Sequence, residues 1–265
     1  MTESKYTRQT VTHVQTWVPE KLFSVHVTRD PAFTFQAGQF ARVGLPDASD
    51  PDGPPTLWRA YSMVNAPQQD GLEFYSIVVP DGLFSPRLAQ LRAGDALYVD
   101  KTSFGFLTIE RFPQGGDLWL LATGTGLSAY LSILRDPATW QAFERIILVH
   151  GVRSANELAY RDEIENWPRQ PAYAEYFKQD PRKLIYLPIA TREVIPGMPQ
   201  ARLTTLIEDG GLEQLAGIPL DAQQSKVMLC GNPAMLSDAR KLLATRGFAP
   251  GRRGIPGNLA VENYW

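Results

Sequence analysis

At 265 residues the chain is too long for one small core and suits two domains, and its 20% charged and 44% hydrophobic residues are typical of a globular enzyme. Its 26 basic and 28 acidic residues give a net charge of −2, so we expect neither nucleic acid nor a membrane as a partner. The single cysteine, Cys230, excludes an internal disulfide and an iron–sulfur cluster held by this chain alone.

The first hundred or so residues alternate apolar and polar side chains with the period of a β-strand. In the stretch 21–30, Phe23, Val25 and Val27 share one face. Similar stretches at 39–45 and 72–79 are separated by turn residues, notably the Pro- and Asp-rich segment 46–55. Short strands at this spacing predict an antiparallel barrel or sandwich.

The stretch LWRAYSMVN (57–65) is unusually polar for such a strand. Alternation places Arg59, Tyr61 and Met63 on one face and Ser62 on the other. A cation, an aromatic ring and a hydroxyl therefore come from neighbouring positions, which ordinary core packing does not explain.

One helix is expected in this half, at SPRLAQLRAG (85–94). Ser85 can cap its amino end, and Pro86 suits the first helical turn. Gly94 can end the helix.

After Phe112 continuous apolar strands alternate with helical stripes. The predicted strands are 118–123, 145–152, 183–191 and 226–232, with helices after them at 124–136, 156–167, around 202–209, and at 233–247. Asn232 can cap the last helix, Pro233 can begin it and Gly247 can stop it. The alternation predicts a parallel, doubly wound sheet, and the Pro/Gly cluster at 110–118 separates the domains 1–111 and 112–265.

Three of these strand ends carry residues suited to a phosphorylated ligand. In ATGTGLS (122–128) the glycines let backbone amides approach an anion or a flat ring, although a simple tight turn is the alternative. Arg153 and Arg192 follow the next two strands and Arg202 opens a helix, as phosphate-binding guanidinium groups do, although each alone suits a solvated surface. Cys230 is either a small core residue or part of a cofactor pocket.

No metal site and no targeting segment are expected. His13, His26 and His150 are scattered, and none has the spacing of a metal-binding motif. Residues 1–14 lack the apolar stretch of a signal peptide, and no run of about 18 apolar residues is present, so we expect a cytoplasmic protein.

Together these segments resemble the bacterial ferredoxin/flavodoxin–NADP⁺ reductases. RAYSM (59–63) is similar to the RxYS flavin motif of that family, and DGLFSPRLAQLRAGD, FGFL, LATGTGLSAYLSIL, HGVRSANELAY, TRE, MLCGNPAM and VENYW follow in its order across essentially the whole chain. The resemblance implies a six-stranded antiparallel Greek-key barrel that binds FAD, then a doubly wound NADP(H) domain with an aromatic tail that returns to the flavin. It also implies hydride transfer from NADPH to flavin N5, with ferredoxin or flavodoxin as a separate, acidic one-electron carrier.

The resemblance further implies roles for individual residues. Arg59 would neutralise the FAD pyrophosphate, Tyr61 would pack against the flavin and Ser62 would hydrogen-bond near N5. The implied FAD-binding residues are Arg59, Ala60, Tyr61, Ser62, Tyr75, Ser76, Ile77, Val78, Leu83, Phe84, Ser85, Thr125, Glu262, Tyr264 and Trp265. The implied NADP-binding residues are Thr125, Gly126, Arg153, Thr191, Arg192, Arg202, Gly231, Asn232 and Pro233, of which Thr191, Arg192 and Arg202 would hold the 2′-phosphate. The implied catalytic residues are Ser62, Cys230, Glu262 and Tyr264.

Two features of the site stay as hypotheses. Tyr264 would stack on the flavin and would have to shift for hydride transfer; the alternative is that the aromatic tail covers an edge of the hydrophobic core. Glu262 is either a proton relay or a solvated carboxylate. Because alternation puts Tyr61 and Ser62 on opposite faces, the strand must end or twist there for both to reach one flavin.

Other functions remain open at this point. A reductase component serving an oxygenase would share the chemistry but have another electron acceptor. A redox-sensing flavoprotein would not turn over, and Arg192 and Arg202 argue against a pure sensor. A barrel-and-sheet protein without flavin would be colourless. For an acidic carrier, Arg87, Arg92 and Lys101 are docking candidates, and we expect a monomer.

Overall fold

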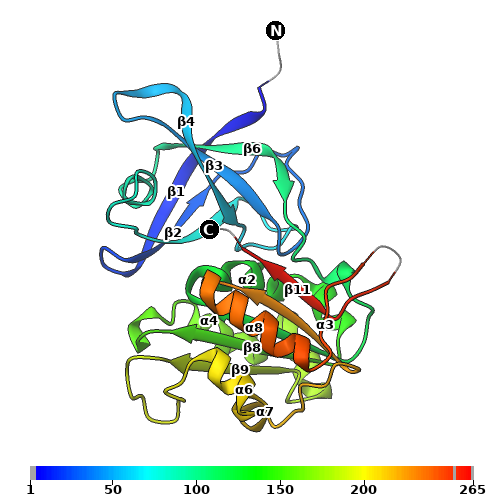
Figure 1. Cartoon of the computed structure of the whole chain (residues 1–265). Helices are drawn as coiled ribbons and strands as arrows, with labels where there is room; N and C mark the ends of the chain where they lie inside the picture. Colours follow the sequence, from blue (N-terminus) through cyan, green and yellow to red (C-terminus); the bar gives the residue numbers. More distant parts are fainter. Residues whose placement is uncertain (1–3, 253–254, 264–265) are drawn as a thin grey trace. The chain divides into compact units, whose positions relative to one another are not determined.

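A computed structural model describes residues 4–252 and 255–263, which divide into two compact units (Figure 1). The first unit comprises residues 4–108 and 128–136, and the second comprises residues 109–127, 137–252 and 255–263. The first unit thus ends at Thr108, near the boundary that the sequence pattern places at 111/112, but it also takes in 128–136.

The first unit is an antiparallel barrel. Its strands are β1 (Tyr6–Val18), β2 (Leu22–Val27), β3 (Phe40–Asp47), β4 (Asp50–Ser62), β5 (Leu72–Ile77) and β6 (Ala96–Phe104). They pair in the order β4-β3-β6-β1-β2-β5, and a bridge between Met63 and Phe74 joins the end of β4 to β5. The predicted six-stranded Greek-key barrel is therefore confirmed.

The barrel core contains the faces that alternation predicted. Ala41 and Val43 of β3 and Val25 of β2 are fully buried, whereas Arg42 between the two β3 residues is exposed. Burial of one face by apolar side chains is what fixes the register of each strand, because a slip by one residue would expose that face.

The prediction of a loop at 46–55 is wrong, because this segment forms the outer end of a β-hairpin. β3 runs to Asp47 and β4 begins at Asp50. The Asp47 carboxylate accepts bonds from the amide and the hydroxyl of Ser49, at 2.9 and 2.7 Å, which lower the pKa of Asp47 and close the turn. The prolines of β4 are tolerated because β4 is an edge strand that needs no donors on its outer side.

The helix predicted at 85–94 is only one turn long, α1 (Ser85–Leu88). Ser85 does not cap it: Phe84 holds the cap position, and the Ser85 hydroxyl accepts the amide of Val79 at 2.9 Å instead. Beyond Leu88 the chain continues in isolated turns until Gly94, where φ is +97°.

The second unit is a parallel five-stranded sheet with helices. Its strands are β7 (Asp117–Thr123), β8 (Arg145–Val152), β9 (Leu184–Ala190), β10 (Ser225–Cys230) and β11 (Leu259–Glu262). The helices of the rest of the chain are α2 (Leu127–Arg135), α3 (Pro137–Ala142), α4 (Arg161–Asn166), α5 (Pro171–Gln179), α6 (Leu203–Glu208), α7 (Gly211–Ala216) and α8 (Pro233–Thr245), and the 3₁₀ turns are η1 (Ile109–Arg111), η2 (Gly124–Gly126), η3 (Ala155–Glu157) and η4 (Trp167–Arg169). The strand order β11-β10-β7-β8-β9 confirms the predicted doubly wound sheet.

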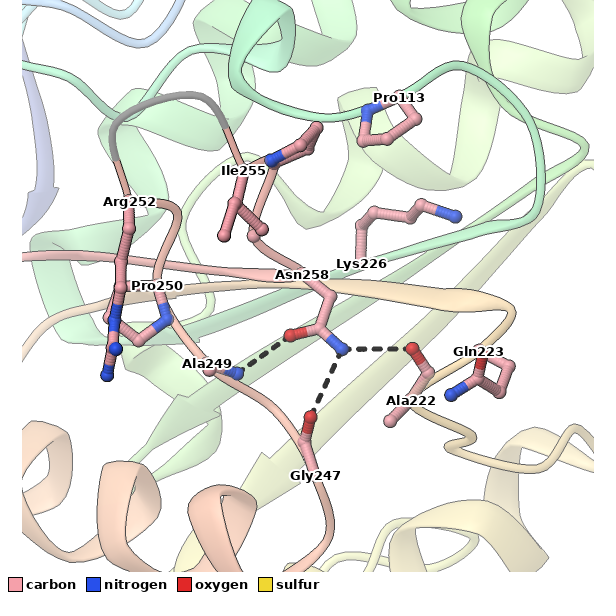
Figure 2. Close-up of a pocket in the computed structure, with 12 residues that line it drawn as sticks. Pro113, Ala222, Gln223, Lys226, Gly247, Ala249, Pro250, Arg252, Ile255 and Asn258 are labelled. Carbon is pink, nitrogen blue, oxygen red and sulfur yellow. Dashed lines mark hydrogen bonds between the residues drawn. The ribbon is translucent and has the colours of Figure 1, made fainter.

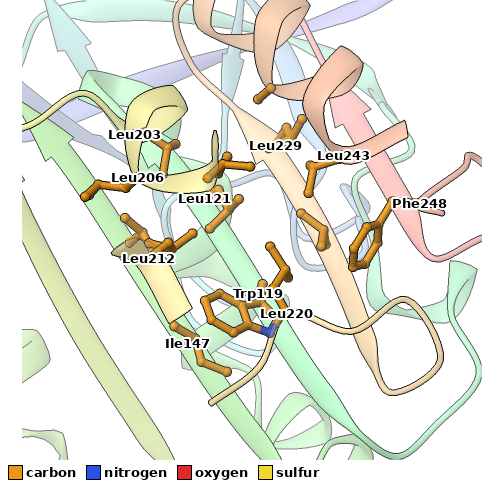
Figure 3. Close-up of a cluster of buried hydrophobic side chains, with 14 of the residues drawn as sticks. Trp119, Leu121, Ile147, Leu203, Leu206, Leu212, Leu220, Leu229, Leu243 and Phe248 are labelled. Carbon is orange, nitrogen blue, oxygen red and sulfur yellow. The ribbon is translucent and has the colours of Figure 1, made fainter. Parts of the chain in front are cut away.

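Both faces of this sheet are buried. On one face Trp119, Leu121 and Ile147 pack against leucines of α6, α7 and α8 (Figure 3). The alternate strand residues Leu120 and Leu148 are equally inaccessible to solvent. This two-sided burial explains why the strands read as continuous apolar runs in the sequence.

The two best-defined helix signals gave different outcomes. The signals for α8 are confirmed. Asn232 Oδ1 accepts the amides of Ala234 and Met235 at the start of the helix. Gly247 lies just beyond the end of the helix and has φ +88°. The single helix predicted over 156–167 is broken, because Tyr160 adopts a left-handed conformation at φ 61° and α4 begins only after it.

The loop that leads into β11 is anchored by Asn258. Its Oδ1 accepts the Ala249 amide at 2.7 Å, and its Nδ2 donates to the carbonyls of Ala222 and Gly247 (Figure 2). The loop borders an open cavity of about 460 Å³ at the amino-terminal end of the strands. The anchor thereby sets the register in which β11 reaches the opposite, carboxyl end of the sheet.

Two features are absent from the part of the chain that the structure describes. None of its helices is both long and apolar enough to cross a membrane. No three His, Cys, Asp or Glu side chains of that part form a group that could hold a metal ion.

His150 of β8 is buried in the sheet with an unusual environment. Its Nδ1 lies 3.3 Å from the hydroxyl of Tyr186, and its Nε2 has no hydrogen-bond partner among the described residues. Burial lowers the pKa of His150 from 6.5 to about 4, against a smaller opposing effect of the Glu157 carboxylate. The folded protein therefore holds this imidazole neutral.

We expect this histidine to make the fold sensitive to acid. Between pH 6.5 and pH 4 the unfolded chain takes up a proton at His150 that the folded chain does not, so stability is full above pH 6.5 and falls as the pH drops, by about 3 kcal/mol in total. His150→Gln should flatten this part of the profile of unfolding free energy against pH, measured by urea denaturation. Equal slopes in the wild type and His150→Gln would contradict the assignment.

Candidate functional site

The polar stretch 57–65 lies at the end of β4. Arg59 and Tyr61 pair across the strands with Val43 and Ala41, so their side chains lie on the same face of β4. Ser62 pairs with Phe40, one position further along, and faces the other way. β4 ends at Ser62, which agrees with the expectation that the strand ends where these faces diverge.

Tyr61 joins three segments of the barrel. Its ring lies 5.9 Å from that of Phe84 and 6.3 Å from that of Phe74, and its phenol oxygen accepts a bond from the Ser76 hydroxyl at 3.2 Å. Burial raises the pKa of Tyr61, so the phenol stays neutral. The end of β4, the end of β5 and the segment before α1 are thereby brought together, and each carries residues that the resemblance assigns to FAD.

Arg59 is an exposed cation beside this cluster. Its Nη1 donates to the carbonyl of Trp58 at 2.7 Å, and it has no carboxylate partner among residues 4–252 and 255–263. A guanidinium group that the fold does not neutralise suits an anionic ligand such as a diphosphate. The residues present therefore fit the phosphate-bearing part of FAD.

The remaining residues predicted for this site differ in exposure. Tyr75, Ser76, Phe84 and Ser85 are buried, Ala60, Ile77 and Val78 are intermediate, and Leu83 is 70% exposed. The bond from Val79 to Ser85 closes the loop that presents Leu83. A large apolar side chain held open to solvent in this way fits contact with a flat ligand ring.

In the second unit the predicted residues gather at the carboxyl ends of the strands. The order of the sheet reverses between β7 and β10, and open parallel sheets bind ligands at such a reversal. The turn Gly124–Gly126 follows β7, and the segment 231–233 follows β10. Thr125, Gly126, Gly231, Asn232 and Pro233 are thus brought to one place.

The two turns approach each other too closely for side chains. A Cβ on Gly126 would lie 2.4 Å from the carbonyl oxygen of Cys230, and a Cβ on Gly231, where φ is +139°, would lie 2.6 Å from the carbonyl oxygen of Thr123. Gly124, in contrast, has φ +54° and open space where its Cβ would be. Gly126 and Gly231 therefore allow the two backbones to touch, whereas Gly124 leaves space that a ligand can enter.

A second group of predicted residues lies beyond β8 and β9. The amide of Arg192 donates to the carbonyl of Arg153 at 2.9 Å, and the Thr191 hydroxyl donates to the carbonyl of Val152. Arg153 is oriented by the buried Glu157, which accepts its amide at 3.0 Å and its Nε at 3.1 Å. The segments after the two strands therefore run side by side.

Arg192 and Arg202 complete this group as exposed cations. The amide of Ala201 bonds to the carbonyl of Ala190, which returns the chain to the end of β9 and places Arg202 there at the start of α6. Neither guanidinium group forms a hydrogen bond or an ion pair within the described residues. Two uncompensated cations at one edge fit a phosphate group.

Cys230 is not placed for thiolate chemistry. It is completely buried at the end of β10, and burial raises the pKa of its thiol, with a further rise from the charge of Glu262. Glu262 pairs in register with Cys230 at the end of β11. The Cys230 thiol is thus neutral and lies next to the site, and the half-buried Glu262 provides a carboxylate there.

Sequence reasoning missed two acidic residues that support this site. Glu157 holds Arg153, and the carboxylate of Glu193 accepts the Ala155 amide at 2.8 Å, which ties the loop after β9 to η3. The four-residue spacing from Arg153 to Glu157 was a usable signal, whereas nothing local marks Glu193. Tyr264 and Trp265, predicted to contact the flavin, lie outside the described residues.

The candidates for carrier docking differ in exposure. Arg87 is half-buried and donates to the carbonyl of Pro46 at 2.8 Å, so it supports the β3–β4 hairpin. Arg92 and Lys101 are exposed. Of the three, Arg92 and Lys101 better suit an encounter surface.

Comparison with known proteins gives concordant matches. Residues 120–241 match the family of oxidoreductase NAD-binding domains. The chain is 40% identical to ferredoxin–NADP reductase A of Sorangium cellulosum over 97% of this chain and 89% of that protein. It is also 40% identical to flavodoxin/ferredoxin–NADP reductase of Escherichia coli K12, over 96% of this chain and 97% of that protein.

A solved structure matches over the same length. A ferredoxin NADP⁺ reductase from Neisseria gonorrhoeae with bound FAD and NADP aligns with a TM-score of 0.89 at 32% identity, covering 99% of this chain and 100% of that one. A ferredoxin-NADP⁺ reductase from Plasmodium falciparum, at 16% identity and a TM-score of 0.68, shares the fold.

The contrast between Gly124 and Gly126 gives a direct test of the turn geometry. Gly124→Ala should lower the unfolding free energy by about 1–2 kcal/mol, because only the left-handed backbone is strained. Gly126→Ala should cost about 3 kcal/mol or more, since its methyl group meets the Cys230 backbone. Urea denaturation of both variants measures the difference, and equal costs would contradict the close approach of the turns.

Proposed function

The chain belongs to the ferredoxin/flavodoxin–NADP reductase family, and we propose that it catalyses electron exchange between NADP(H) and a ferredoxin or flavodoxin through bound FAD. The observation that carries this proposal is the 40% identity to such reductases along nearly the whole chain. It is supported by the exposed cations that the fold leaves without carboxylate partners in each unit. Bound FAD supplies the redox chemistry, exchanging a hydride with NADP(H) at N5 and single electrons with the carrier.

On the flavin side, the barrel residues bind and orient. Arg59 neutralises the pyrophosphate, and Tyr61, fixed by Ser76 and Phe84, offers an aromatic surface to the flavin. The Ser62 hydroxyl, on the other face at the end of β4, holds a hydrogen bond near N5. Because β4 ends there, Tyr61 and Ser62 would both reach a flavin held at the end of the strand.

On the nicotinamide side, the strand ends of the second unit divide the coenzyme between them. The turn with Thr125 and Gly126 and the segment from Gly231 to Pro233 receive the nicotinamide half at the point where the sheet order reverses. Thr191, Arg192 and Arg202 bind the 2′-phosphate, and Arg153, oriented by Glu157, contacts the dinucleotide. This division favours NADPH over NADH.

The two remaining predicted residues of the site have distinct roles. Glu262 carries a half-buried carboxylate at the end of β11, next to Cys230 in register, from which it would relay a proton. Cys230, a neutral buried thiol, contributes shape to the nicotinamide pocket and no nucleophile. The chemistry therefore depends on positioning two rings more than on acid–base groups.

The carrier is proposed from the family and from charge. Relatives are named for ferredoxin alone or for both flavodoxin and ferredoxin. An acidic carrier is expected to meet exposed basic residues of the barrel, with Arg92 and Lys101 as candidates. We place the reaction in the cytoplasm and expect a monomeric enzyme.

A turnover assay tests the proposed function. The purified protein should be yellow, should release FAD on denaturation, and should reduce cytochrome c with NADPH only when a ferredoxin or flavodoxin is added. Reduction of an oxygenase component in preference to either carrier would favour the oxygenase-reductase alternative. A flavoprotein that NADPH does not reduce would leave only the sensor, and a colourless protein would overturn the proposal.

Arg192→Ala should separate the two coenzymes. Loss of a charged hydrogen bond to the 2′-phosphate should raise the NADPH KM about 10- to 100-fold and leave the NADH KM nearly unchanged. Steady-state kinetics with both coenzymes measure this, with Arg240→Ala, at an exposed position on α8, as the control. Equal increases in the KM values of NADPH and NADH would contradict the assignment of Arg192 to the 2′-phosphate.

A further inference from the structure

Two turns that lie far apart in the sequence are locked together at the carboxyl end of the second sheet. β7 and β10 are neighbouring parallel strands with Ala122 opposite Cys230, so the residues that follow them leave the sheet side by side. Gly126 and Gly231 allow each turn to touch the backbone of the other. Backbone contact alone fixes how near the turns come, but it does not fix their rotation.

The side chain of Thr123 supplies the directional link. Its Oγ1 accepts the backbone amide of Asn232 at 2.9 Å, across 109 residues of sequence. A Cβ on Gly231 would lie 2.2 Å from the same oxygen, so the hydroxyl fits against a glycine that leaves room for it. A hydrogen bond to a backbone amide has a preferred direction, and it thereby sets the orientation of the second turn.

Asn232 passes this constraint on to a helix. While its amide donates to Thr123, its Oδ1 accepts the amides of Ala234 at 3.0 Å and Met235 at 3.3 Å, which caps α8. The glycine-rich turn after β7 and the first turn of α8 are therefore joined through one residue. The cap at Asn232 is visible in the sequence, but its link to Thr123 is not, since Thr123 reads as the last position of an ordinary strand.

We propose that Thr123 is a positioning residue for the coenzyme: its hydroxyl holds the two turns at the spacing that the part common to NADPH and NADH requires. This inference rests on the proposed function, which places Thr125 and Gly126 on one side of the coenzyme and Gly231 to Pro233 on the other. Thr123 acts through Asn232 and needs no contact with the coenzyme. Its effect differs from that of Arg192, which reads only the 2′-phosphate.

Thr123→Val tests the proposal because it keeps the shape and removes the acceptor. The KM values of NADPH and NADH should both rise about 3- to 10-fold, by the same factor, with kcat changed less than twofold. Thr123→Ser should restore wild-type values, since it retains the hydroxyl. The matched control is Thr28→Val in the barrel, where the hydroxyl likewise accepts a distant amide, from Thr10 at 3.0 Å, and where both KM values should stay unchanged.

The outcomes separate this inference from the proposed function. An active wild type with Thr123→Val unaltered, or with Ser and Val equally impaired, overturns the role of the hydroxyl while the function stands. A wild type that NADPH does not reduce overturns the function and the inference with it. If Thr123→Val does not fold, hydrogen exchange of the Asn232 amide in the wild type decides: slow exchange supports the link, and exchange as fast as that of an unstructured amide overturns it.

Discussion

The close approach of β7 and β10 at their carboxyl ends is the constraint on which the nucleotide-binding half depends. Where these neighbouring strands leave the sheet, the backbone of each turn occupies the space that a side chain on the other would need, at Gly126 and Gly231. Because the sheet order reverses between these two strands, helices that follow them diverge and leave their amino ends at the reversal. The glycines, the cap of α8 and the position of Cys230 all follow from this approach.

Two groups of arginines in this chain differ in how their charge is compensated. Arg135 pairs with Glu73 at 2.7 Å, and Arg145 pairs with Asp117 at 2.7 Å, and both pairs support the fold. Arg59, Arg192 and Arg202 are exposed and have no carboxylate partner within the described residues. A cation left uncompensated in this way can bind phosphate without first breaking an ion pair, so the compensation pattern is itself a guide to where anions bind.

The sequence predicted what local patterns encode and missed what distant contacts decide. Because β7, β8 and β10 are buried on both faces, their sequences are continuous apolar runs, from which the strands were recognised. The Asn232–Pro233–Gly247 pattern predicted α8 correctly. The segment 46–55 was misread as a loop because its prolines suit turns, yet an edge strand accepts them. At the site, glycines and arginines at strand ends were recognisable by residue type, whereas the Thr123–Asn232 and Glu193–Ala155 bonds join residues that no local spacing connects.

The strand order also dictates when the nucleotide site can exist during synthesis. β7, β8 and β9 pair in chain order, so each can add to the sheet as it leaves the ribosome. The partner of β7 on its other side is β10, and the bond from Asn232 reaches back over 109 residues. The proposed coenzyme site is consequently among the last parts of the second unit to form, and a nascent chain that ends before Asn232 has strands and helices but lacks one side of that site.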